Sequence, residues 1–136
     1  MDDVLINKIA IIEKCLKRIK EEYVGFEKDF DINYTKQDSI ILNLQRACEA
    51  TIDLAARLIK MNNYGIPQKT RDVFVLLEDN KIISKELSEK LQKMVGFRNI
   101  AVHDYKSINL EIVRSILENK LLDFLEFTKL IIEKFS

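Results

Sequence analysis

Residues 4–24 read VLINKIAIIEKCLKRIKEEYV, and their apolar side chains recur at alternating spacings of four and three. The rhythm continues a little beyond this segment, and one stripe collects the large apolar side chains Leu5, Ile9, Ile12, Leu16, Ile19, Tyr23, Phe26 and Phe30. That spacing keeps the stripe on one side of an α-helix, as in helices that bury one face in a bundle. No strand-like alternation competes with the helical pattern.

The same pattern returns after a short interruption, for which residues 29–35 are predicted to form a loop. A second helix is predicted to start near Thr35, where Asp38 three residues later gives a capping-box signal. Its apolar face consists of Ile41, Leu44, Cys48, Thr51, Ala55 and Leu58. Residues 62–67 are predicted to form a loop, in which Gly65 is suited to ending the helix and Pro67 to opening the next one.

Three more helices complete the predicted fold. The first covers residues 68–78, and the last covers residues 109–135. The helix between them is predicted to begin after Ser84, which serves as its N-cap. We therefore predict an all-α protein, an antiparallel bundle of about five helices in a single domain over residues 1–136.

The composition limits the function. Of the 136 residues 47% are apolar and 32% are charged, with 22 basic and 22 acidic side chains, so a strongly basic protein that coats nucleic acid is not expected. Only three glycines are present, and no phosphate-binding glycine motif can be drawn from them. Cys15 and Cys48 match no metal spacing and are predicted to be reduced core thiols. With neither a signal peptide nor a membrane-spanning run in the sequence, we expect a cytoplasmic protein without metal or cofactor.

Residues 95–106 differ from the rest of the chain. They read VGFRNIAVHDYK and contain the only histidine, His103, together with Arg98, Asn99, Asp104 and Tyr105. They also contain a glycine, Gly96, which costs about 1 kcal/mol relative to alanine inside a helix. We expect a glycine there only where a backbone or a ligand approaches closely.

Arg98 and His103 suit one reaction in particular. Histidine exchanges protons near neutral pH, and arginine is a permanently charged fork for phosphate oxygens. Together they match metal-independent RNA cleavage, in which the 2′-hydroxyl attacks the adjacent phosphorus. The two residues are five positions apart, about 140° around an ideal helix, so they share no helix face. Either the helix ends or bends between them, or they meet across a symmetric interface.

One histidine per chain favours the interface, because acid and base roles are easiest with two groups. A twofold homodimer would bring two copies of Arg98 and His103 into one cleft. The non-catalytic alternative is that Arg98 pairs with a carboxylate and His103 caps a helix C-terminus. Asp53 and Arg57 are either supporting residues at the edge of the cleft or members of a salt-bridged helix flank.

The string Met94 to Tyr105 resembles the HepT toxin branch of the HEPN superfamily, a group of helical-bundle ribonucleases. Their extended motif R-x4-H-x-Y is satisfied by Arg98, His103 and Tyr105, with the polar Asn99 after the arginine. The resemblance runs along the whole chain, including the Gly65-Ile66-Pro67 loop and the following Arg71-Asp72-x-Phe74.

The resemblance implies a metal-independent endoribonuclease toxin of a type VII-like toxin–antitoxin pair, with its active site at a homodimer interface. It implies Arg98 and His103 as catalytic residues. From their positions in the sequence we add Asn99, Asp104, Asp53 and Arg57 as RNA-contacting or supporting residues. It also implies a small nucleotidyltransferase antitoxin, MntA-like, that transfers AMP onto Tyr105. The alternatives are a non-catalytic HEPN subunit that binds such a nucleotidyltransferase or its substrate, and a plain structural bundle.

Overall fold

The computed structural model describes residues 1–136 and is entirely helical, without a strand. It contains α1 (Asp3–Tyr23), α2 (Glu27–Phe30), α3 (Tyr34–Asn62), α4 (Asp72–Asp79), α5 (Lys85–His103), the short 3₁₀ turn η1 (Tyr105–Ser107), α6 (Leu110–Asn119) and α7 (Leu121–Phe135). The predicted all-α class is confirmed, although seven α-helices replace the five expected.

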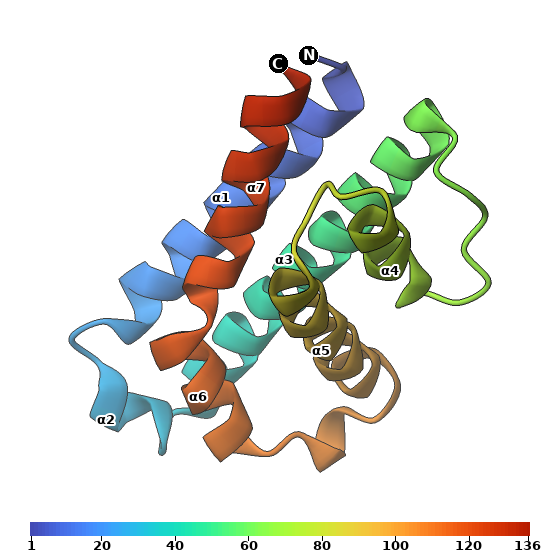
Figure 1. Ribbon diagram of the computed structural model, residues 1–136. Helices are drawn as coiled ribbons and strands as arrows, with labels where there is room; N and C mark the ends of the chain where they lie inside the picture. The colour runs from blue at the N-terminus through green and yellow to red at the C-terminus, as the bar shows by residue number, and fades with distance from the viewer.

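The long helices form the bundle around α3 (Figure 1). α1 and α5 both pack against α3, and α7 contacts both α1 and α5. α4 fits between the end of α3 and the start of α5, and the two chain termini lie at the same end of the molecule. α5 therefore has a fixed position on α3 and carries the polar motif to its far end.

The stripe that opens the sequence lies in the core. Leu5, Ile12, Ile19 and the other α1 members of the stripe are buried, and so is Phe30 on α2. Phe26 is the exception, with 47% of its surface exposed, because α1 ends at Tyr23 and Gly25 turns the chain with a φ of 86°. Both cysteines are free and buried, as predicted.

Two helix starts differ from the prediction because of local side-chain caps. Residues 29–35 are not one loop: α2 extends to Phe30, and α3 already begins at Tyr34. The cap of α3 is Asn33, whose Oδ1 accepts from the Lys36 N–H at 3.0 Å, and Asp38 makes no capping bond.

The helix expected over 68–78 begins only at Asp72. The Asp72 carboxylate accepts from the backbone N–H groups of Gln68 and Lys69, at 2.9 and 3.1 Å, and holds the preceding residues in turns. At the other side of this loop, α3 is ended by the left-handed Asn63 (φ 55°) and not by Gly65.

The helix predicted over 109–135 is two helices, which meet at Lys120. The backbone of Lys120 leaves the helical region (φ −125°, ψ −1°), so α7 takes a new direction against α1 and α5. The buried residues Leu117, Leu121 and Phe124 keep the three–four spacing across the break. The sequence pattern therefore contains no sign of it.

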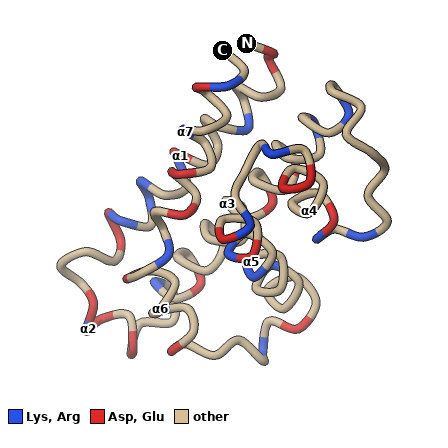
Figure 2. The backbone as a smooth tube through the Cα atoms, viewed as in Figure 1, with Lys and Arg blue, Asp and Glu red and all other residues tan.

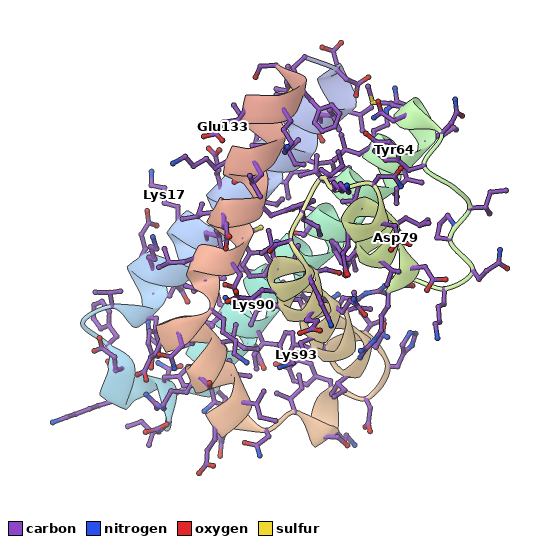
Figure 3. All side chains as sticks on the ribbon, in the orientation of Figure 1. Lys17, Tyr64, Asp79, Lys90, Lys93 and Glu133 are labelled. Atoms are coloured by element: carbon purple, nitrogen blue, oxygen red, sulfur yellow. The ribbon has the colours of Figure 1, made fainter.

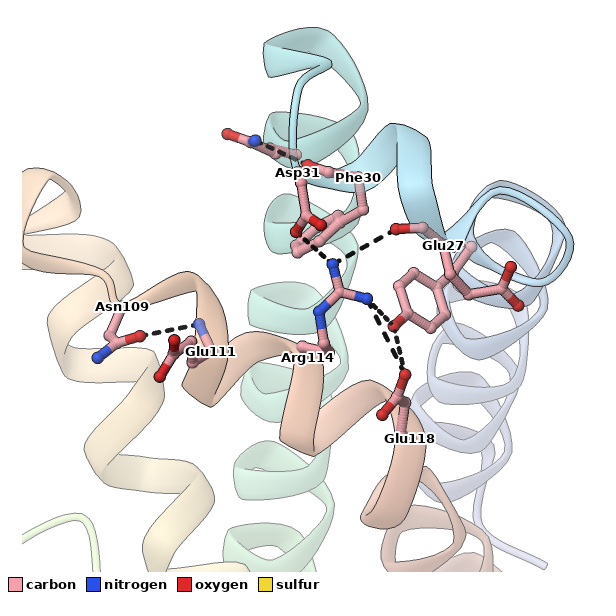
Figure 4. Close-up of polar contacts among 9 residues, drawn as sticks. Glu27, Phe30, Asp31, Asn109, Glu111, Arg114 and Glu118 are labelled. Carbon is pink, nitrogen blue, oxygen red and sulfur yellow. Dashed lines mark hydrogen bonds and ion pairs between the residues drawn. The ribbon is translucent and has the colours of Figure 1, made fainter.

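Arg114 fastens α6 to the first two helices (Figure 4). Its guanidinium donates to the Tyr23 hydroxyl at 2.8 Å and to the backbone carbonyl of Glu27 at 3.4 Å, and it forms an ion pair with Asp31. Tyr23 in turn donates to Glu118 at 2.8 Å. Burial, reinforced by this bond, raises the pKa of Tyr23 to about 12, so the network keeps its protons throughout the physiological range.

Charges of both signs are spread over most of the surface (Figure 2), whereas the charged side chains of the short helix α4 are all acidic. None of the seven helices combines the length and the apolarity that crossing a membrane requires.

Candidate active site

α5 presents the motif on a continuous helix. Ser84 caps its N-terminus by accepting from the Leu87 N–H at 3.1 Å, and buried side chains such as Leu91 and Met94 anchor it in the core. The helix runs without interruption to His103, its last residue, and η1 begins two residues later. The alternative in which the helix ends or bends between Arg98 and His103 is therefore excluded for this chain.

This continuity divides the motif between two sides of α5. Asn99 and His103 are four residues apart and share one face, on which both are exposed. Arg98 lies about 140° from His103 around the helix, toward α3. Within one chain the two side chains therefore lie on different sides of the helix.

Arg98 has no partner within the chain. It makes no ion pair, which excludes the carboxylate pairing considered from the sequence, and its buried Nε has no hydrogen-bond acceptor. Arg98 lies close enough to Cys48 on α3 to act on its thiol. Burial raises the pKa of that thiol to about 12, and the positive charge of Arg98 partly opposes the rise. An unpaired buried donor costs about 1–3 kcal/mol, so an acceptor from outside the chain is expected at this position.

His103 is exposed in the last turn of α5, and its imidazole makes no hydrogen bond or ion pair. Both nitrogens are therefore accessible to a ligand. Its position at the helix end agrees with the alternative of a capping histidine, but the backbone carbonyls of that turn receive no bond from it.

Tyr105 follows the helix at the start of η1 and is 43% exposed. Its hydroxyl donates to Oδ1 of Asp38 on α3, a contact between residues 67 positions apart. Partial burial and this bond raise the pKa of Tyr105 to about 12. The tyrosine is therefore a neutral phenol whose oxygen is held at the surface of α3.

The other predicted site residues have local partners. Asp104 accepts from the Ser107 hydroxyl at 2.6 Å and shapes η1. Asp53 pairs with Lys8 at 3.1 Å, and Arg57 pairs with Asp2 at 2.8 Å, both at the junction of α3 and α1. No bond joins Asp53 or Arg57 to the motif, so the structure places them in the salt-bridged flank that was the alternative.

The surface beside the motif is partly apolar. On α5, Ile100 and Val102 are each 44% exposed, close to His103 in the chain. On α3, Asp38, Leu42, Gln45 and Glu49 follow one another at helical spacing and form one exposed or half-buried stripe that begins at the Tyr105 contact. The motif thus borders surface that a second protein can cover.

The structure adds two residues that sequence reasoning missed. Asp38 was interpreted as a cap, and nothing in the pattern connected it with Tyr105. Arg71 lies over Gly96: a Cβ built on that glycine would be 2.9 Å from the guanidinium Nη2. The glycine signalled a close approach, but its sequence context could not identify the approaching group.

Arg71 and Gly96 also border a groove of about 500 Å³ between α5 and α6. Met94, Phe97 and Ile100 supply apolar lining, and basic side chains including Lys90 and Lys93 surround it (Figure 3).

Comparison with known proteins identifies the family to which this fold belongs. The family model described as "Ribonuclease HepT-like" matches residues 12–131, which includes every helix that builds the site. The chain belongs to the ribonuclease HepT-like family.

Its relatives are close in sequence and in structure. The chain is 50% identical over 131 residues to the mRNA nuclease HepT of Shewanella oneidensis, covering 96% of this chain and 98% of that protein. The tri-AMPylated Shewanella oneidensis HEPN toxin, solved in complex with an MNT antitoxin, superimposes with a TM-score of 0.93 at 49% identity and covers 98% and 100% of the two chains. A toxin–antitoxin structure with AMP-PNP matches equally well, with a TM-score of 0.93, 48% identity and the same coverage.

Proposed function

We propose that this HepT-like chain is a metal-independent endoribonuclease toxin that acts as a homodimer. The observation that carries the proposal is the pairing of an unpartnered, half-buried Arg98 with an exposed, unpartnered His103 on one rigid helix. Support comes from the 50% identity to an mRNA nuclease over nearly the whole chain.

The proposed reaction uses the RNA's own 2′-hydroxyl as nucleophile. His103 of one subunit takes the proton of that hydroxyl as its oxygen attacks the adjacent phosphorus. The 5′-oxygen leaves with a proton from His103 of the partner subunit. The products are a 2′,3′-cyclic phosphate and a free 5′-hydroxyl, and each proton taken by one imidazole is balanced by the proton that the other gives.

Arg98 stabilises the reacting phosphate. Its guanidinium is permanently charged and lacks an acceptor in the chain, so it can place its donors on the non-bridging oxygens as negative charge accumulates. Within one chain Arg98 and His103 point away from each other, and a twofold partner supplies the complementary pair. In this dimer the exposed Val102 and Leu42 would be buried against the partner subunit.

Control of the toxin is proposed to come from a nucleotidyltransferase that transfers AMP onto Tyr105. The half-exposed phenol is accessible at the end of the motif. The similar HEPN toxin of Shewanella oneidensis is tri-AMPylated and bound to an MNT antitoxin. The added phosphodiester would place negative charge near Arg98, where substrate phosphate binds.

Induced expression tests this function directly. Wild type should arrest growth and degrade RNA, whereas His103→Ala should do neither, because losing an acid–base group typically costs about 10²–10⁴ in rate. The matched control is Lys93→Ala, an exposed change on the same helix that removes a charge outside the motif. In the purified reaction EDTA should leave cleavage unchanged.

Cleavage that survives His103→Ala, or that EDTA stops, contradicts the proposed chemistry. A toxin that stably folds and binds a nucleotidyltransferase but never cleaves RNA would instead be a non-catalytic partner subunit.

A further inference from the structure

Asp38 is an exposed carboxylate with a single partner. It stands in the second turn of α3, where the helix is already capped by Asn33, and no lysine or arginine pairs with it. Its Oδ1 accepts the hydrogen bond of the Tyr105 hydroxyl. The carboxylate is therefore directed at the one oxygen that AMP transfer would modify.

We propose that Asp38 is the general base of that transfer, removing the phenolic proton of Tyr105 as its oxygen attacks the α-phosphorus of a nucleoside triphosphate. This role rests on the AMP transfer proposed above and adds to it a catalytic group that the toxin itself provides.

The chemistry requires such a base. Partial burial and the bond to Asp38 keep the pKa of Tyr105 at about 12, so only about one phenol in 10⁵ is ionised at pH 7. Asp38 raises this pKa both through the hydrogen bond and through its negative charge. A neutral phenol is a poor nucleophile, and a base already in contact with its proton removes it during attack.

The step balances as a single displacement. The Tyr105 oxygen forms a bond to the α-phosphorus, the bond from that phosphorus to the bridging oxygen breaks, and pyrophosphate leaves. The proton passes to the Asp38 carboxylate and then to water. The product has no hydroxyl proton, so its bond to Asp38 is lost, and the new phosphodiester charge repels the carboxylate. The modified tyrosine is then free to leave α3.

The test compares Asp38→Asn with Asp38→Glu and with Asp79→Asn. The asparagine keeps an acceptor oxygen for Tyr105 but cannot take a proton, and the glutamate restores the base. Asp79, the last residue of α4, is exposed, makes no side-chain bond and lies on a different helix (Figure 3). Each protein is incubated with the cognate nucleotidyltransferase, ATP and Mg²⁺, and the adduct is followed by intact mass spectrometry at several pH values.

We expect Asp38→Asn to slow the first AMP addition about 10²-fold near pH 7, with Asp79→Asn unchanged and Asp38→Glu partly restored. The rate of Asp38→Asn should rise about tenfold per pH unit, because hydroxide must replace the base, whereas the wild-type rate should stay nearly flat. Circular dichroism of all the variants, and RNA cleavage by Asp79→Asn, should match wild type.

Two results would overturn the role of Asp38. One is modification of Asp38→Asn at the control rate; the other is a slowing that is equal at every pH, which would make Asp38 only a positioning residue. A wild-type toxin that is never modified, or one modified equally when Tyr105→Phe is introduced, would overturn the proposed AMP transfer itself.

Discussion

Arg98 and Arg114 are both arginines at the edge of the core, yet their surroundings are opposite. Arg114 has a hydroxyl, a carbonyl and two carboxylates as partners, and it lies over the ring of Phe30 at 5.5 Å. Arg98 has none, and its Nε is buried without an acceptor. Side chains that stabilise a fold find their partners within the chain, whereas one kept without partners is available for a ligand.

The sharpest test of this contrast replaces each arginine by methionine, which keeps much of the apolar length and removes the charge. For Arg98→Met we expect RNA cleavage to fall by about 10²–10³-fold, the usual effect of losing one charged transition-state donor. The free energy of unfolding should stay the same or rise, since an unsatisfied buried donor is removed. Cleavage rates and urea unfolding, measured on the same preparation, give both numbers.

Arg114→Met should show the reverse. We expect it to lower the free energy of unfolding by about 2 kcal/mol, because the hydrogen bonds of a partly buried charged group are lost. Cleavage at low temperature, where the variant is still folded, should remain near wild type. If Arg98→Met destabilised the protein as much as Arg114→Met, the distinction between the two arginines would be wrong.

A third arginine, Arg71, extends the comparison to Gly96. A methyl group at Gly96 would meet only the far end of the flexible Arg71 side chain, which can move away. Gly96→Ala should therefore raise the free energy of unfolding by about 0.5–1 kcal/mol, the helical gain of alanine over glycine. A loss of stability in thermal or urea unfolding would show that the close approach is tightly constrained.

The smallest effect is expected at Arg57, whose ion pair with Asp2 lies at the surface. The guanidinium lowers the pKa of the Asp2 carboxyl, so the pair stabilises the fold above the unfolded-state pKa near 4. This contribution disappears as the pH falls through the lower, folded-state pKa. Melting temperatures of wild type and Asp2→Asn should therefore differ slightly at pH 7 and converge as the pH falls through that folded-state pKa. A constant difference across this range would exclude the ion pair as its cause.

The sequence predicts those parts of the fold whose burial repeats the spacing of apolar residues along a helix. The core of α1 follows directly from its spacing, because burial selects every third or fourth residue. The break at Lys120 does not, since Leu117, Leu121 and Phe124 keep the rhythm on both sides of it. The late start of α4 depends on the Asp72 carboxylate, which accepts from the backbone N–H groups of Gln68 and Lys69. The sequence pattern is the same whether those residues form such a turn or continue the helix.

The candidate site divides in the same way. Arg98, His103 and Tyr105 were identified through their unusual concentration in the chain and through the family motif. Asp38 belongs to the site only because α5 packs on α3 and brings residues 67 positions apart together. The contact between Arg71 and Gly96 likewise depends on the packing of α4 beside α5. Contacts between helices require the three-dimensional fold, whatever the strength of the local pattern.

The central claim, that two subunits share one reaction, is tested most directly with a mixed dimer. One subunit is wild type and the other carries His103→Ala, with different affinity tags so that only the mixed species is purified. If one imidazole takes the proton and the partner's imidazole gives it, the mixed dimer should lose at least about 10²-fold in cleavage rate. A mixed dimer that retains half of the wild-type activity, or a fully active toxin that never forms a dimer, would contradict the shared site.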